Sequence, residues 1–94
     1  MNRYEAIFVI SPEADEEKIQ SLIERMKGII EENGSVENID EWGKRKLAYE
    51  VKGFNEGFYV LMNFTADTAI PAEMDRVFKI TDGIIRHMIL REDE

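Results

Sequence analysis

The sequence predicts an α+β fold in which strands and helices follow the order βαββαβ. Four segments are rich in β-branched and aromatic residues, which favours strands. Two segments repeat apolar residues at steps of three and four, which favours helices. Breaks that contain Gly, Pro, Asn or Asp separate these segments. Because the chain has 94 residues, we expect residues 1–94 to form one domain.

The first predicted strand and helix have the clearest patterns. Residues 3–10 combine β-branched and aromatic side chains, and a proline follows shortly after them. Residues 15–33 then place isoleucine, leucine and methionine on one helical stripe, with Asp15 or Ser11 as the N-cap residue. We expect Gly34 to end this helix in the left-handed conformation.

Two further strands are close enough in the sequence to form an antiparallel hairpin. The first is predicted over residues 35–52, and Gly43 within it indicates a bulge or a close approach by another backbone. Its anchoring residues are expected to be Leu47, Tyr49 and Val51. A turn-rich connection is expected over residues 53–57, before a strand over residues 58–64.

The last helix and strand complete the order. Asp67 or Thr68 begins a helix that ends at residues 81–83, and residues 84–91 form a strand before a charged end at 92–94. Two βαβ-type halves with right-handed crossovers give a four-stranded antiparallel sheet with both helices on one face. This is the ferredoxin-like architecture.

Composition excludes several classes of protein. The chain has no cysteine, so neither a disulfide nor a thiolate nucleophile nor a cysteine-ligated metal is available. No apolar run approaches the ~20 residues that a membrane span requires. The N-terminal residues also lack the pattern of a signal peptide. We therefore expect a cytoplasmic protein with no membrane partner.

No pattern points to catalysis, a metal or a cofactor. His87, the single histidine, has no acidic or nucleophilic partner by spacing, so we expect it to face solvent or to fill a gap. The acidic residues near the start of the first helix lack the spacing and glycine of a calcium loop. Some enzymes of this fold hold phosphate after the first strand, where this chain has Pro12 and Glu13. We expect no enzyme, no cofactor, no metal and no small-molecule substrate.

Positive charge is concentrated in one short segment, EWGKRKLAYEVKG. The net charge of the chain is −8, whereas residues 42–53 carry a net charge of +3. Consecutive strand residues point to opposite faces, so Lys44, Arg45 and Lys46 are expected to line an edge or a loop tip. Such cations either discourage edge-to-edge pairing of strands or bind phosphates, while Trp42 packs on a ribose, a base or an apolar side chain.

The predicted sheet also has a face that the helices do not cover. The face toward the helices is expected to carry Tyr4, Phe8, Val60, Met62 and Phe64. The opposite face then carries Ile7, Val9, Tyr59 and Leu61. This second group is too apolar for a freely solvated sheet, which indicates a protein partner or self-association.

The segment from Trp42 to Tyr49, WGKRKLAY, closely resembles the signature of the bacterial small-subunit ribosomal protein six family. The resemblance continues in Arg3-Tyr4-Glu5, in residues 58–63 (FYVLMN), and in residues 84–88 (IIRHM) followed by Arg91. It covers essentially the whole chain in the order that the family has.

This resemblance implies a ferredoxin-like fold, no catalysis, and a structural place in the platform of the 30S subunit. Members of the family bind the central domain of 16S ribosomal RNA cooperatively with ribosomal protein eighteen. Carried over by position, the candidate RNA contacts are Arg3, Trp42, Lys44, Arg45 and Lys46. The candidates for the protein-partner interface are Tyr59, Leu61, Arg86 and Arg91.

Two other functions are compatible with the same element order. A module that reads single-stranded RNA by stacking needs aromatic residues on the open faces of its central strands. Tyr59 offers one, but the K/R-G-F/Y-G/A-F-V pattern is absent. A small-molecule-sensing regulatory domain usually has Gly or Asn after its first strand, where this chain has Ser-Pro-Glu, and would be a dimer in isolation.

Overall fold

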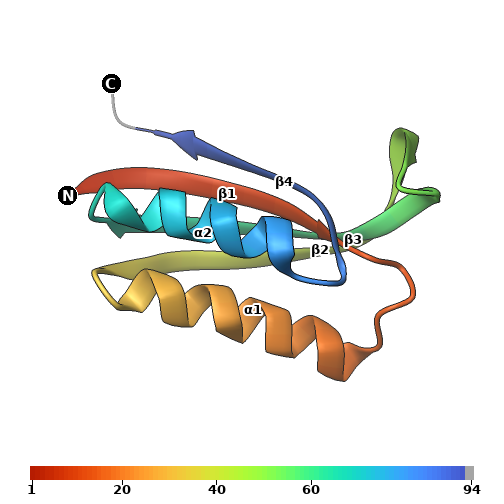
Figure 1. Cartoon of the computed structure of the whole chain (residues 1–94), viewed down its shortest axis with the longest axis horizontal. Coiled ribbons are helices and arrows are strands. Elements are labelled where there is room, and N and C mark those ends of the chain that lie inside the picture. Colours follow the sequence, from red (N-terminus) through yellow and green to blue (C-terminus); the bar gives the residue numbers. More distant parts are fainter. Residues whose placement is uncertain (93–94) are drawn as a thin grey trace.

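A computed structural model describes residues 1–92 and has the element order βαββαβ (Figure 1). The elements are β1 (Asn2–Ile10), α1 (Glu16–Glu31), β2 (Gly34–Val51), β3 (Phe54–Ala66), α2 (Ala69–Ile80) and β4 (Ile84–Arg91). The strands pair antiparallel in the order β2-β3-β1-β4, and both helices cover one face of the sheet (Figure 1). The predicted ferredoxin-like fold is confirmed. Residues 93 and 94 of the predicted charged end lie outside the described residues.

The core lies between the helices and one face of the sheet. The predicted inward residues are all buried: Tyr4, Phe8, Val60, Met62 and Phe64. Phe8 packs against α2, because its ring centroid lies 5.0 Å from that of Phe78. The apolar stripes of both helices complete this cluster, and its burial is the main favourable contribution to folding.

The N-terminus of α1 is capped as predicted, but its C-terminus is not. The Lys18 amide donates a hydrogen bond to Asp15 Oδ1 over 2.8 Å, which satisfies one of the free amides of the first turn. Gly34 does not end the helix in the left-handed conformation, and instead begins β2. A Cβ atom at Gly34 would lie 2.3 Å from the Thr65 carbonyl oxygen, so the close approach of β3 requires glycine. Neither helix within residues 1–92 is long and apolar enough to cross a membrane.

The turn between β2 and β3 is shorter than predicted. It consists of Lys52 and Gly53, with φ angles of 51° and 85°, and Val51 pairs with Phe54 on either side of it. Positive φ at both central residues is the type I′ pattern, whose twist suits a hairpin. Residues 55–57, which were expected in the connection, belong to β3.

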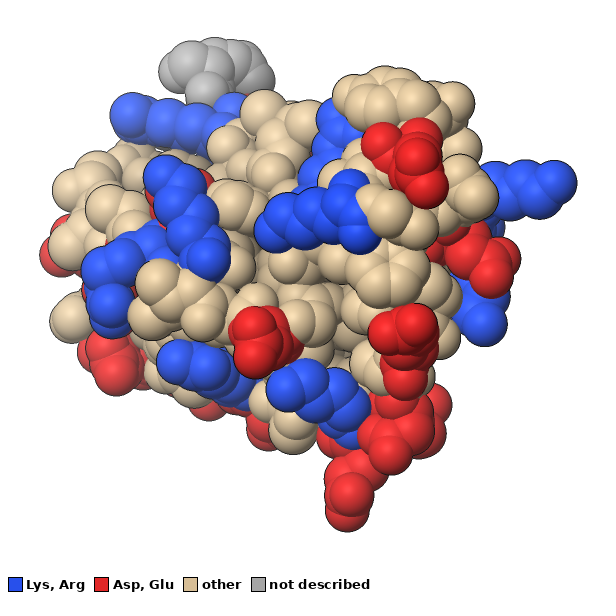
Figure 2. Space-filling model, turned by 45° about the vertical axis from the view of Figure 1, so that its right-hand side comes forward, with Lys and Arg blue, Asp and Glu red and all other residues tan. Residues whose placement is uncertain are grey.

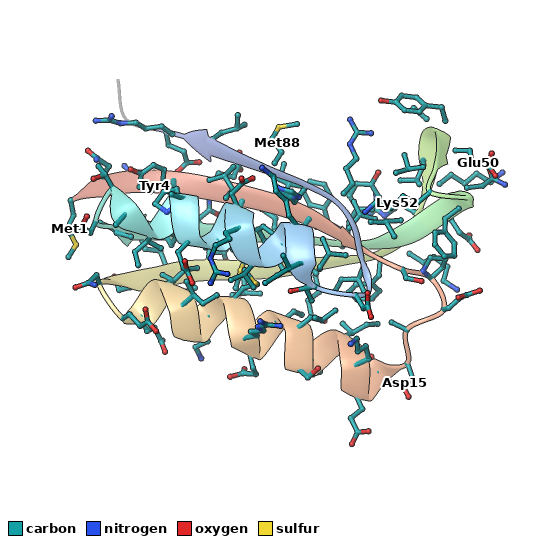
Figure 3. The ribbon with its side chains drawn as sticks, in the orientation of Figure 1. Met1, Tyr4, Asp15, Glu50, Lys52 and Met88 are labelled. Atoms are coloured by element: carbon teal, nitrogen blue, oxygen red, sulfur yellow. The ribbon has the colours of Figure 1, made fainter. Side chains whose placement is uncertain are left out.

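The face of the sheet opposite the helices carries the predicted apolar residues. In the ladders of β1, Ile7 lies opposite Leu61 and Met88, and Val9 lies opposite Tyr59 and Arg86. Figure 3 shows Met88 projecting from β4 on the side away from the helices. We call this surface the open face and define it by Ile7, Val9, Tyr59, Leu61, Arg86 and Met88.

His87 connects β4 to α2 through an ion-pair cluster. Its Nε2 lies 2.7 Å from Asp75 Oδ1, and its ring stacks on Phe78 with centroids 4.9 Å apart. Lys79 Nζ lies 2.9 Å from the other carboxylate oxygen of Asp75. Hydrogen bonds from Lys79 and then from His87 hold the pKa of Asp75 below its ordinary value of 3.8. Spacing indicated no partner for His87 because the acid comes from a different element.

We expect the Asp75→Asn variant to be less stable than the parent protein, by an amount that shrinks in acid. Because the folded pKa of Asp75 is lowered, its carboxylate stabilises the fold above the unfolded pKa. That contribution is lost as the pH falls through the folded pKa. Denaturant unfolding of both proteins from about pH 5 to about pH 2 measures the difference.

The exposed Asp82 provides the control for this prediction, since Asp82→Asn removes the same charge from the loop before β4. A stability difference for Asp75→Asn that stays constant over this pH range would contradict the ion-pair explanation. So would an equal pH dependence in the two variants.

Candidate RNA and protein interfaces

The positively charged segment lies at one end of the sheet, in the distal part of the β2–β3 hairpin (Figure 1, right). We call residues 44–57 the arm. It contains four cations and two carboxylates, in a chain whose net charge is −8. Lys44, Arg45 and Lys46 are all exposed. The arm is therefore a positive feature on an acidic protein.

Two irregularities in β2 shape the arm. The ladder shifts before Gly43, whose φ angle is 85°, and Trp42 is the extra residue of this bulge. This confirms the bulge predicted at Gly43. The ladder shifts again between Lys46 and Val51, so residues 47–50 bulge away from β3. Because bulges bend a strand and increase its twist, they turn the arm out of the plane of the sheet.

The three cations do not share one face of β2. The ladder places Lys44, Arg45 and Lys46 opposite Phe58, Gly57 and Glu56 in turn. Because successive strand residues point to opposite faces, the cations line both sides of the strand, as predicted for an edge. Arg45 Nε also donates a hydrogen bond to the Trp42 carbonyl oxygen over 3.3 Å, which links the cations to the bulge.

Trp42 lies beside the open face. Its ring stacks on that of Tyr59, with centroids 6.1 Å apart and planes inclined by 13°. Its Nε1 donates a hydrogen bond to Asp40 Oδ2 over 3.1 Å. With five residues of the open face and His87, Trp42 lines a hollow of about 290 Å³. We call it the open-face hollow.

The stacking of Trp42 on Tyr59 bears on the single-stranded RNA alternative. The two rings are nearly parallel and already contact each other, so part of their aromatic surface is not available to a base. Trp42 is 38% exposed, whereas Tyr59 is only partly exposed. The open face therefore presents less aromatic surface than a platform that stacks two or three bases.

The bulged part of the arm reaches back to β4. The guanidinium carbon of Arg86 lies 5.5 Å from the centroid of the Tyr49 ring, a cation–π geometry. Tyr49 was expected to anchor β2, but 63% of it is exposed, because residues 47–50 leave the ladder. The arm and the open face are thus adjoining surfaces.

Two of the predicted site residues lie apart from the others. Arg3 lies opposite Thr65, seven positions along β3 from the partner of Lys44, which corresponds to about 23 Å. Arg91 lies opposite Tyr4 on the helix side of β4, and its Nη2 donates a hydrogen bond to Asn2 Oδ1 over 2.9 Å. Arg3 is therefore remote from the arm, and Arg91 is not part of the open face.

Two residues of these surfaces were not assigned by the sequence. Met88 follows Arg86 at a spacing of two in β4, but only the register with β1 shows that both point to the open face. The Tyr49 contact depends on the bulge at residues 47–50, which no glycine marks. Within residues 1–92, no group of three or more His, Asp or Glu side chains is arranged to hold a metal ion.

The surface near the arm has an uneven charge distribution. On the face that Figure 2 shows, acidic side chains gather at the lower right, while Lys and Arg side chains are spread over the rest with single acidic ones among them. Screening in salt limits such surface fields to about 10 Å. The electrostatic attraction of an anionic ligand to Lys and Arg side chains therefore acts only within a short distance of them.

Comparisons with known proteins agree on one family. The family model described as Ribosomal protein S6 matches residues 3–91. The small ribosomal subunit protein bS6 of Clostridium perfringens is 59% identical over 95 residues, which cover 100% of both chains. That of Clostridium botulinum is 56% identical over 94 residues, which cover 99% of this chain and 100% of the relative. A crystal structure of 30S ribosomal protein S6 from Thermotoga maritima has a TM-score of 0.91 and 39% sequence identity, covering 97% of this chain and 87% of that one.

Proposed function

Because the chain belongs to the ribosomal protein S6 family, we propose that it binds 16S ribosomal RNA through its arm and ribosomal protein eighteen through its open face. Residues 1–94 act as one domain in this proposal. Family membership makes the chain a structural, non-enzymatic component of the small ribosomal subunit in translation. As a ribosomal component, it works in the bacterial cytoplasm.

The observation that carries the RNA proposal is the exposure of three consecutive cations on the arm of an acidic protein. Lys44, Arg45 and Lys46 are exposed on both sides of one strand, so they can reach phosphates on more than one side of the arm. The remaining surface has an excess of carboxylates, which repel phosphates. RNA binding is thereby centred on the arm, with Trp42 at its base and Arg3 as a separate contact at the other end of the sheet.

The open face has the character of a protein-binding surface. Its central pairs, Ile7 with Leu61 and Val9 with Tyr59, lie on the side that the helices leave uncovered. Within this group Val9 is buried, with 2% of its surface exposed, so the accessible part consists of Ile7, Leu61 and Tyr59. Aromatic and arginine residues such as Tyr59 and Arg86 are enriched among the residues that dominate binding energy. The net charge of −8 also favours encounter with a basic protein over an acidic one.

The two surfaces support cooperative binding because they adjoin. Three or four phosphate contacts alone give weak and salt-sensitive binding. The arm meets the open face where Tyr49 contacts Arg86, and Trp42 at the base of the arm stacks on Tyr59 of the open face. A protein bound on the open face would therefore stand beside the RNA bound on the arm. Contacts between these two ligands would couple their binding.

A titration of the protein into a fragment of the 16S central domain tests this proposal. Without ribosomal protein eighteen we expect weak binding, and with it we expect an affinity at least about tenfold higher. For the weak complex, a plot of the logarithm of the binding constant against the logarithm of the salt concentration should have a slope of about −2 to −3, as expected for three phosphate contacts. Equal affinity with and without ribosomal protein eighteen would refute the cooperative model.

A further inference from the structure

The five methionines differ strongly in exposure. Met26, Met62 and Met74 lie in the core, with 2%, 0% and 0% of their surface exposed. Met88 is 46% exposed and Met1 is 81% exposed. Met1 lies at the start of the chain, at the opposite end of the molecule from the arm residues Glu50 and Lys52 (Figure 3). A soluble oxidant therefore reaches one methionine of the open face without unfolding the protein.

Met88 lies on the open face in the edge strand β4. It lies opposite Ile7 in the ladder of β1 and β4, and it lines the open-face hollow together with Trp42 and Tyr59. The hollow is also lined by two apolar and two polar residues, which are Ile7, Val9, Arg86 and His87. A change in the polarity of this single side chain would therefore change the character of the surface.

We propose that Met88 is a site of reversible oxidation, at which a peroxide converts the apolar open face into a polar surface. A sulfur lone pair attacks one oxygen of hydrogen peroxide and the O–O bond breaks. That oxygen stays on the sulfur as a sulfoxide, and the other oxygen leaves as water with both protons. Methionine sulfoxide reductases reverse the change. In that reaction two thiols are oxidised to a disulfide, and the oxygen leaves as water.

The consequence for partner binding rests on the function proposed above. In the free protein, water solvates the sulfoxide oxygen. Beneath a protein partner that oxygen loses its water, and the Ile7 and Val9 side chains of the hollow offer no hydrogen bond to replace it. The guanidinium of Arg86, which also lines the hollow, already lies over the Tyr49 ring. We therefore expect affinity for ribosomal protein eighteen to fall by at least about tenfold. The bound partner covers Met88, so oxidation acts on the protein before assembly.

Peroxide treatment of the intact chain, followed by peptide mass mapping, tests the modification site. We expect Met1 and Met88 to gain one oxygen atom each and the three core methionines to gain none. A mixture of A-type and B-type methionine sulfoxide reductases should remove both additions. Oxidation of Met88 no faster than that of Met26, Met62 and Met74 would overturn the proposal.

The Met88→Leu variant separates the effect of Met88 from that of Met1, because leucine conserves volume and cannot be oxidised. Peroxide should shorten the retention of the parent protein on a hydrophobic-interaction column and leave that of Met88→Leu nearly unchanged. It should likewise weaken binding to ribosomal protein eighteen only in the parent protein. Equal changes in both proteins, or no change in the oxidised parent, would overturn the proposal. If the untreated protein fails to bind ribosomal protein eighteen, the proposed function fails instead, and mapping and retention still decide the oxidation site.

Discussion

Replacement of Lys44, Arg45 and Lys46 together by glutamate is expected to reduce affinity for the 16S central-domain fragment by at least about 100-fold. The variant loses three cations that can each displace a counterion from RNA, and it places three carboxylates against the phosphates. For the same reason, the slope of the logarithm of the binding constant against the logarithm of the salt concentration should become less negative by about 2 to 3. Filter binding or fluorescence anisotropy over a salt series, with ribosomal protein eighteen present, measures both effects.

The fold should tolerate this change. The three side chains are exposed, and exposed substitutions usually alter stability by about 0.5 kcal/mol or less each. Lys46→Glu does place a carboxylate opposite Glu56, a like-charge pair that adds a small cost. We expect the Tm to fall by less than about 12 °C. Collapse of the fold would count against the view that these residues serve RNA binding.

A matched control separates the location of the charges from the net charge. Lys18, Arg25 and Lys27 lie on α1, on the helix side of the sheet, and their joint replacement by glutamate changes the net charge by the same amount. We expect this control to lose much less affinity for RNA than the arm variant. An equal loss in the two variants would show that net charge, and not the arm, governs binding.

The second large effect is expected on the open face, where Leu61→Gln should weaken binding to ribosomal protein eighteen by at least about thirtyfold. Leu61 lies opposite Ile7 at the centre of this face. A glutamine amide there keeps a similar size but must lose its water when a partner covers it. Isothermal titration calorimetry with the two purified proteins measures the loss.

The control for this second variant is Ile80→Gln. Ile80 is an exposed apolar residue, 64% accessible, at the end of α2 and therefore on the other side of the sheet. It undergoes the same chemical change without altering the open face. Undiminished binding by Leu61→Gln, or the same loss in Ile80→Gln, would exclude the open face as the partner surface.

Local patterns in the sequence predicted most of the fold because each element buries one face. The stripe of α1 and the alternation in β1 and β3 follow from periodicities of 3.6 and 2 residues. A residue such as Phe8 is assigned to the core by its spacing alone, and its burial confirms the assignment. The N-cap at Asp15 is equally local, since its partner amide is three residues away.

The β2–β3 hairpin shows where local patterns fail. The sequence after Val51 contains two glycines and an asparagine, which favour a longer connection than the two-residue turn at Lys52 and Gly53. Pairing with β3 selects the shorter turn, and Lys52 adopts a positive φ that few non-glycine residues adopt. The prediction that Gly34 ends the helix in the left-handed conformation was wrong for a related reason. Glycine is required at this position because the backbone of β3 leaves no room for a side chain.

The sequence by itself determined the fold, the family resemblance and the concentration of cations in a short segment of an acidic chain. These properties depend on residue type and spacing, which a single sequence contains.

Only the tertiary structure decided which residues share a surface. It joined Tyr49 to Arg86, placed Trp42 on Tyr59 and brought Met88 to the open face. It also separated Arg3 from the arm and Arg91 from the open face. The physical reason is that bulges and ladder register set these positions, and both arise from pairing between strands distant in sequence.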